Sequence, residues 1–184
     1  MAKIAVLKER ASGEARVAAT AETVKKFVSL GATVSVETGA GLSAGVSDAD
    51  YTAAGAKIGS AADCLTKADI ILGVQGPEPK LLASAPKGAW VVASLDPFGQ
   101  RARVDAYAKA GVDALAMDFM PRITRAQSMD ILSSQSNLAG YKAVIDAAAA
   151  YGRAFLMMMT AAGTISAARA FIMGVGVAGL QAIA

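Results

Sequence analysis

The sequence predicts an α/β protein with a mainly parallel sheet, a long helix after the sheet, and the opening of a second α/β domain. Three observations predict it: apolar runs alternate with helical segments up to about residue 120, an uninterrupted helical pattern follows, and a glycine-rich motif comes near the end. The chain has 184 residues, of which 54% are hydrophobic, so it can form one full domain and the start of another.

The first elements carry clear start and stop signals. KIAVL, residues 3–7, has the pattern of a short buried strand, and a polar loop follows it. The next helix lies near residues 20–31, where Thr20 is placed to cap the first turn and Gly31 to end the last. TVSVE, residues 33–37, is the second strand.

The same alternation continues along the chain. Further strands are predicted at 69–74, 89–95 and 113–118, with helices near 60–68, before Pro86 and near 100–111. Strands separated by helices predict a Rossmann-like domain, with a mainly parallel sheet and helices on both faces. Such sheets bind ligands at the C-terminal ends of their strands, so we expect a site in the loops after residues 7, 74 and 95.

A long helix follows the sheet. Thr124 and Gln127 have the spacing of a capping box, which predicts a helix that begins at Arg125. Nothing stops it before residues 151–152, so it is predicted to run for roughly 27 residues, or about 40 Å. That length suits an interdomain helix.

A polar stripe runs along this helix. Its members recur at intervals of three or four residues and are Gln127, Asp130, Ser134, Asn137 and Tyr141, with Ser133 beside them. A solvated face would ordinarily carry Lys and Glu, whereas short amides and hydroxyls suit hydrogen bonding to a ligand in a confined site. Arg122, just before the helix, is either a surface arginine or a fixed positive charge for that ligand.

Near the end of the chain, a short apolar strand at 170–173 is followed by Gly174, Gly176 and Gly179 in the G-x-G-x-x-G spacing. The first glycine allows a tight turn, the second lets backbone approach a pyrophosphate, and the third lets helix and strand pack closely. The acidic residue expected about 20 positions later is absent, so the sequence looks like a fragment. Glycine-rich apolar sequence is also typical of a helix that packs against a neighbour.

Composition excludes several classes of function. Lys and Arg number 18 against 15 Asp and Glu, and they are scattered, which argues against nucleic acid as a partner. Histidine is absent and Cys64 is the one cysteine, so neither a disulfide framework nor a metal site is expected, and a reducing cytosol fits. The charged N-terminus is no signal peptide, and the apolar run at 170–183 is too short to span a membrane.

Three further features have mainly structural interpretations. Residues 157–160, MMMT, are expected to pack in the core. Cys64 is expected to be an inert small side chain, because no histidine is available to activate it. Arg16 lies in a charged loop, residues 8–18, and is placed either to take a carboxylate or a cofactor or simply to be solvated.

Five blocks resemble the alanine dehydrogenase and transhydrogenase superfamily. They are KERASGEARVAAT, ETGAG, MDFMPRITRAQSMDILSSQSNLAGYKAVIDAA, MMMTAAGT and GVGVAGLQAIA. The middle block most closely resembles the NAD(H)-binding alpha component of proton-translocating NAD(P) transhydrogenases. This resemblance implies an N-terminal α/β domain over residues 1–124, a connecting helix and linker over 125–167, and the truncated start of an NAD-binding Rossmann domain over 168–184.

The resemblance also implies site residues. Arg122, Gln127, Asp130 and Ser133 would lie beside the nicotinamide and act in catalysis, with Ile123, Thr124, Ser128 and Met129 lining the pocket. The pyrophosphate would lie against Val175, Gly176 and Val177, and Gly174 and Gly179 of the glycine motif complete the predicted cofactor-binding set. We hypothesise that Asp130 orients Arg122 or accepts a hydrogen bond from the nicotinamide carboxamide.

Implied partners complete this expectation. The chain would bind NAD(H), form a homodimer, and dock with an NADP(H)-binding beta component and a membrane-embedded proton-channel component. It would therefore lie in the cytoplasm, peripherally on the cytoplasmic face of the inner membrane.

Two alternatives remain. An alanine dehydrogenase-like enzyme needs a lysine and a histidine where the resemblance places Gly73 and Ser94, and only the arginine counterpart, Arg16, is present. Hydride transfer between two nicotinamide rings, by contrast, needs no general acid or base, which fits a chain without histidine. The other alternative is a truncated, non-catalytic module that binds nucleotide or dimerises.

Overall fold

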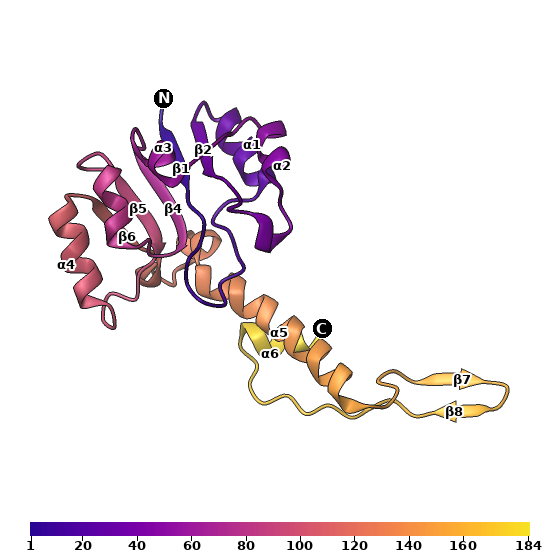
Figure 1. Ribbon diagram of the computed structural model, residues 1–184. Helices are drawn as coiled ribbons and strands as arrows, with labels where there is room; N and C mark the ends of the chain where they lie inside the picture. The colour runs from indigo at the N-terminus through magenta and orange to yellow at the C-terminus, as the bar shows by residue number, and fades with distance from the viewer. The chain divides into compact units, whose positions relative to one another are not determined.

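Six parallel strands form the sheet in the N-terminal portion of the chain. The computed structural model describes residues 1–184 and divides into two units, residues 1–119 and residues 120–184. The strands of the first unit are β1 (Lys3–Val6), β2 (Thr33–Glu37), β3 (Lys57–Gly59), β4 (Ile70–Gln75), β5 (Trp90–Ser94) and β6 (Asp113–Ala116), in the order β3-β2-β1-β4-β5-β6 (Figure 1). Every neighbouring pair is parallel, which confirms the predicted Rossmann-like sheet. The strand order reverses between β1 and β4, where such sheets bind ligands.

Helices cover both faces of this sheet (Figure 1). They are α1 (Ala21–Ser29), α2 (Asp48–Ala53), α3 (Ala61–Leu65) and α4 (Arg101–Ala110), with 3-10 helices at Leu42–Ala44, Pro79–Ser84 and Met117–Phe119. Two apolar cores lie between helices and sheet, one around Val36 and Tyr51 and the other around Ile71 and Tyr107. Their separation follows from a sheet that is buried on both sides.

The predicted helix signals act where the sequence places them. The Thr20 hydroxyl accepts from the amide of Thr23 at the start of α1, and Gly31, just beyond its end, has a φ of 86°. The segment before Pro86 forms a 3-10 helix rather than an α-helix. α2 and β3 were not predicted, because both are short and α2 buries only Tyr51.

The long helix of the second unit begins later than predicted. α5 runs over Ile131–Tyr151, which is 21 residues, and Gly152 ends it in the left-handed conformation as expected. The prediction that the helix begins at Arg125 is wrong. Thr124–Met129 forms a 3-10 helix that lacks a side-chain cap, so Thr124 and Gln127 make no capping box.

The C-terminal portion of the second unit also departs from expectation. β7 (Met158–Thr160) and β8 (Gly163–Ile165) form an antiparallel hairpin, and α6 (Val177–Ile183) follows. The methionines at 157–159 are 52% to 73% exposed, so the prediction that they pack in the core is wrong. The predicted strand at 170–173 is also wrong: it belongs to neither sheet, because no strand pairs with its amides and carbonyls.

Candidate functional site

A pocket of about 230 Å³ lies in the first unit at the C-terminal ends of β1 and β4, where the sequence predicts a site. Its wall is made mainly by the loops after these two strands, and the charged or amide side chains on it are Lys8, Glu9, Arg10, Gln75, Glu78 and Arg103. A hollow of about 310 Å³ lies at the other end of β4 and β5, against Asp69, Lys87 and Trp90. None of the residues predicted to bind the nicotinamide or the pyrophosphate borders either of these two pockets.

The Glu9 carboxylate braces the end of β4. It accepts hydrogen bonds from the backbone amides of Val74, at 2.6 Å, and of Gln75, at 3.2 Å, where the pairing of β4 with β5 shifts register. Burial is the main reason that the pKa of Glu9 is raised, although these two hydrogen bonds act to lower it. A side chain at Gly73 would place its Cβ 2.6 Å from the carbonyl oxygen of Gln75, so only glycine fits this bend.

Arg16 is held by Glu14 in the loop after β1. Its Nε and Nη2 donate to the two Glu14 carboxylate oxygens at 2.7 and 2.6 Å, and the Gln75 side-chain amide also donates to that carboxylate, at 3.3 Å. The hydrogen bond from Arg16 is the main reason that the pKa of Glu14 falls from 4.5 to about 2. Arg16 thus forms part of a carboxylate-bound loop, which the sequence left undecided.

Ser94 has a similar structural role at the end of β5. Its hydroxyl donates to the Asp118 carboxylate at 2.7 Å, and the amide of Leu95 donates to the same carboxylate at 2.7 Å. Burial raises the pKa of Asp118, but several hydrogen bonds, led by those from Leu95 and Ser94, together lower it further than burial raises it, so the pKa is lowered. The hydroxyl therefore fixes the loop that follows the strand.

In the second unit, Asp130 and Ser133 meet at the start of α5. The Asp130 carboxylate accepts from the amides of Leu132, at 2.9 Å, and Ser133, at 3.1 Å, and from the Ser133 hydroxyl at 2.7 Å. The hydrogen bond from the Ser133 side chain is the main reason that the pKa of Asp130 is lowered, and the charge of Arg122 lowers it further. Asp130 is thus the N-cap of the helix, a role that the sequence assigned to Thr124.

The other residues predicted beside the nicotinamide lie in the preceding segment. Arg122 and Ile123 are exposed, and the 3-10 helix after them presents Thr124, Gln127, Ser128 and Met129 to the surface. Within the predicted set, a hydrogen bond joins the side chains of Asp130 and Ser133. The predicted polar stripe is broken, because Gln127 precedes the cap, whereas Ser134, Asn137 and Tyr141 lie within α5.

The glycine motif forms a turn and the first residues of α6. Gly174 has a φ of 99°, which favours glycine, and the added Cβ of any residue at 179 would overlap the carbonyl oxygen of Gly174. Gly176, the N-cap residue of α6, has no atom near the position that a Cβ would take. The turn therefore requires glycine at 174 and 179 for backbone geometry, whereas the backbone of Gly176 is free of neighbouring atoms on its Cβ side.

Reasoning from sequence missed the bracing by Glu9 and the contact between α5 and α6. Glu9 contacts amides 65 and 66 residues away, and no local signal indicates such a pair. Gly140, a lone glycine inside a helical pattern, was a signal that could have been read, because it commonly marks close packing. It is the one buried residue of α5.

Neither metal chemistry nor thiol chemistry has a basis in the described residues. No group of three or more His, Cys, Asp and Glu residues is placed to hold a metal ion. Cys64 is buried, and burial is the main cause that raises the pKa of its thiol to about 11. The thiol therefore stays protonated at neutral pH, as expected of an inert side chain.

Comparison with known proteins relates the chain to one family along its whole length. Residues 5–139 match the model of the alanine dehydrogenase/PNT N-terminal domain, and residues 143–184 match that of the C-terminal domain. An NAD(P) transhydrogenase subunit alpha chain of Rhodospirillum rubrum is 54% identical over 188 residues, which cover 99% of this chain and 49% of the relative. Alanine dehydrogenase of Bacillus subtilis is 29% identical, covering 97% of this chain and 47% of that enzyme.

Solved structures agree with this relation. The transhydrogenase from Sinorhizobium meliloti superimposes with a TM-score of 0.91 at 55% identity, covering 98% of this chain and 54% of that one. An L-alanine dehydrogenase superimposes with a TM-score of 0.82 at 27% identity, covering 98% of this chain and 50% of that one. The chain spans 35% to 49% of the length of the curated relatives it matches.

Proposed function

The chain belongs to the alanine dehydrogenase/PNT family, and we propose that it is the NAD(H)-binding portion of an NAD(P) transhydrogenase alpha component. The observation that carries this choice within the family is the state of the first unit. Gly73 and Ser94 occupy the positions where the resemblance to alanine dehydrogenase requires a lysine and a histidine. Gly73 admits no side chain, and the Ser94 hydroxyl is bound to Asp118. The first unit therefore offers no proton acceptor there for oxidising an amino acid.

The reaction that we propose is hydride transfer between NADH bound here and NADP⁺ bound on a partner component. When bound, the nicotinamide ring supplies the hydride chemistry. The chain has to hold that ring in place and exclude water, and neither task needs a general acid or base. The absence of histidine from the sequence is compatible with both tasks.

The second unit contains side chains that suit this binding. We assign Arg122, Gln127, Asp130 and Ser133 to the nicotinamide end and the turn from Gly174 to Gly179 to the pyrophosphate. In support, the open flank of Gly176 lets a ligand approach the backbone, and the left-handed Gly174 directs the chain around that point. Arg122 would supply a positive charge, while Asp130 would keep α5 and the Ser133 hydroxyl in position.

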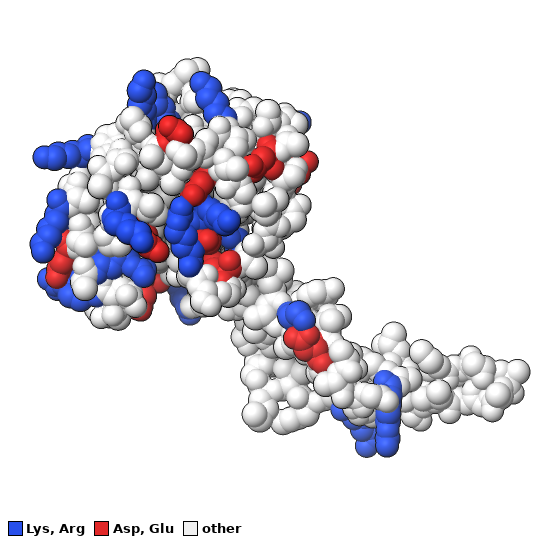
Figure 2. Space-filling model, viewed as in Figure 1, with Lys and Arg blue, Asp and Glu red and all other residues white.

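Exposed apolar surface in the second unit supports partner binding. The side chains of Leu138, Tyr141, Leu156, Met159 and Phe171 are each more than half exposed. On the face shown in Figure 2, the second unit is largely uncharged, whereas acidic and basic side chains are interspersed over the first unit. Such apolar area on a protein marks surfaces that are covered in an assembly, so we propose a homodimer that docks with NADP(H)-binding and membrane-embedded components.

Membrane association would come from those partners, on the cytoplasmic face of the inner membrane. None of the helices in this chain combines the length and the apolar character that crossing a bilayer requires. The division into domains at residues 124 and 167 also remains a prediction.

Reduction of an oxidised nicotinamide analogue by NADH tests the proposal, with full-length protein and the NADP(H)-binding component supplied. We expect turnover that depends on both components. Oxidation of L-alanine with NAD⁺ would instead support the dehydrogenase alternative, and nucleotide binding without any turnover would support a non-catalytic module.

A further inference from the structure

α5 and α6 cross at a single glycine in the second unit. Gly140 is the one buried residue of α5, and an added Cβ there would overlap the carbonyl oxygen of Ala178 and lie 2.9 Å from its carbonyl carbon. The obstructing atoms belong to backbone, so a side chain at 140 cannot be accommodated by a rotamer change. It would force α6 away from α5.

A second contact joins the same two helices one turn earlier on α5. The Asn137 side-chain amide donates to the side-chain carbonyl oxygen of Gln181 at 3.0 Å. Asn137 and Gly140 are three residues apart and therefore lie on one face of α5. The two contacts fix both the separation of the helices and their register, and Figure 1 shows α6 alongside the middle of α5.

This crossing lies between two groups of residues that the proposed function assigns to one ligand. Ser133, near the start of α5, belongs to the nicotinamide end, and it lies seven residues, or about 10 Å, before Gly140 along the helix. Ala178 lies within the glycine motif, between Gly176 and Gly179, at the pyrophosphate end. A displacement of α6 from α5 therefore changes the distance between the two ends of the site.

We propose that Gly140 and the Asn137–Gln181 pair are positioning residues that set the distance between the nicotinamide end and the pyrophosphate end of a bound dinucleotide. The inference rests on the proposed function, because it concerns how the same site is built. It assigns these residues no contact with the ligand. They act through Ser133 on one helix and through the glycine turn on the other.

The size of the effect follows from the overlap. A normal contact between a carbon and a carbonyl oxygen is about 3.3 Å or longer, so α6 must shift by about 1 Å in Gly140→Ala. Misplacement of a reacting group by about 1 Å costs about 100-fold in rate. Loss of the neutral Asn137–Gln181 hydrogen bond is smaller, about 3-fold to 10-fold in NADH affinity.

The test compares NADH with AMP as probes, using full-length Gly140→Ala protein with its NADP(H)-binding component. AMP carries only the adenosine and one phosphate, so it does not bridge the two ends. We expect hydride transfer to fall about 100-fold and the Kd for NADH to rise, while the Kd for AMP stays at its wild-type value. The Tm should fall, because the overlap with backbone destabilises the contact between α5 and α6, but the variant should remain folded at the assay temperature. The matched control is Ala139→Gly, which exchanges the same two residue types at the neighbouring, exposed position. We expect its rate of hydride transfer to be unchanged.

Two results would overturn the inference. One is wild-type hydride transfer and NADH affinity in Gly140→Ala, and the other is a parallel loss of AMP and NADH binding, which indicates general damage to the fold. If Gly140→Ala does not fold, Asn137→Ala and Gln181→Ala decide the matter. Each should weaken the binding of NADH but not of AMP, and the double variant should bind NADH no more weakly than either single variant. Unchanged NADH binding in both single variants would again refute it. Failure of the wild-type protein to transfer hydride would refute the proposed function itself, and this inference with it.

Discussion

Removing the Glu9 carboxylate should loosen the C-terminal end of β4. In Glu9→Ala, the amides of Val74 and Gln75 lose the acceptor that they share at 2.6 and 3.2 Å. A hydrogen bond to a charged group contributes about 1.5 to 3 kcal/mol, and an unpaired buried amide costs about as much. The site is half buried and water reaches some of it, so we expect a total loss of about 2 to 3 kcal/mol.

Glu9→Gln separates charge from shape at the same position. Its side-chain oxygen can still accept from Val74, but its NH2 group would face the amide hydrogen of Gln75, which cannot accept. One hydrogen bond is retained and one is lost, so we expect a cost of about 1 kcal/mol. A smaller loss of stability in Glu9→Gln than in Glu9→Ala would indicate that both carboxylate oxygens of Glu9 accept hydrogen bonds.

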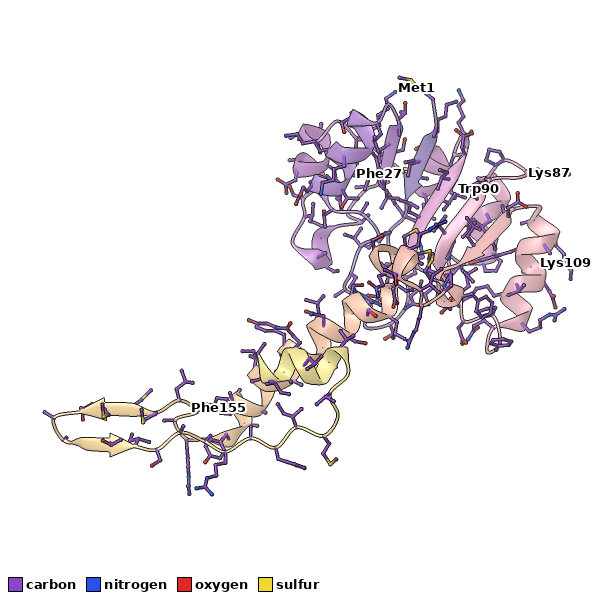
Figure 3. All side chains as sticks on the ribbon, turned by 180° about the vertical axis from the view of Figure 1, so that it is seen from behind. Met1, Phe27, Lys87, Trp90, Lys109 and Phe155 are labelled. Atoms are coloured by element: carbon purple, nitrogen blue, oxygen red, sulfur yellow. The ribbon has the colours of Figure 1, made fainter.

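Urea unfolding measured by tryptophan fluorescence reports the stability of the first unit, which contains the Glu9 contact. Trp90 is the single tryptophan, and it lies on β5 directly opposite Ile70 of β4 (Figure 3). With an m value of about 2 kcal/mol/M, the midpoint should fall by about 1 to 1.5 M in Glu9→Ala and by about 0.5 M in Glu9→Gln. Glu22→Ala is the control, because Glu22 lies 80% exposed in a surface pair with Lys26, and such pairs contribute little.

The pH dependence follows from the raised pKa of Glu9. A carboxyl group whose pKa is raised by folding stabilises the folded protein most below its ordinary value, near 4.5, and this contribution is lost as the pH rises through the raised value. The stability of wild type relative to Glu9→Gln should therefore grow as the pH falls from 7 toward 4.5. Equal midpoints for wild type and Glu9→Ala at pH 7 would refute the reasoning, because water would then be satisfying both amides.

Two other carboxylates have predicted effects of a different kind. Glu14 has a pKa of about 2 because Arg16 binds it, so its contribution is present above pH 4.5 and lost as the pH falls toward 2. We expect about 1 to 2 kcal/mol after allowing for the exposure of Arg16, and Glu14→Gln should abolish this acid-dependent loss in pH-dependent urea unfolding. Asp130→Asn keeps a side-chain oxygen for the cap of α5, so circular dichroism should show unchanged helix content while hydride transfer slows. Asp130→Ala should lower both the helix content and the rate of hydride transfer. A wild-type rate in Asp130→Asn would show that Asp130 serves only as the N-cap of α5.

The elements that sequence predicted well have local causes. Thr20 and Gly31 act on α1 through their own backbone neighbours, and the strand near residue 70 is an apolar run bounded by polar residues. β3, with three residues, has too little pattern to distinguish it from a loop. Local information therefore identifies long, periodic segments and misses short ones that tertiary pairing stabilises.

The start of α5 shows how two local signals compete. Thr124 with Gln127 and Asp130 with Ser133 both have a capping residue and a partner three positions later. Asp130 prevails, because its carboxylate binds two amides and a hydroxyl at once, whereas the Thr124 side chain caps no amide. The sequence contains both signals, but their relative strength depends on the three-dimensional arrangement.

The candidate site was predicted by motif rather than by contacts. Residue spacing identified the glycine motif and the polar residues around Asp130, and the resemblance gave them a ligand. Neither could supply the partners of Glu9, which lie at least 65 residues away. The exposed methionines of the hairpin illustrate the same limit, since an apolar run predicts burial without saying whether the chain itself or a partner provides it.

The charges of the first unit are used to hold loops in shape. Glu9 holds the bend of β4, Glu14 holds Arg16, and Asp118 holds the loop after Ser94, so each of these carboxylates already has backbone or side-chain donors. A reaction that needed one of them as a proton acceptor would have to break such a contact. Hydride transfer has no such requirement, and its rate depends instead on alignment. The residues that govern it should therefore include ones without any reactive group, and Gly140, whose lack of a side chain fixes the distance between two helices, is the sharpest case.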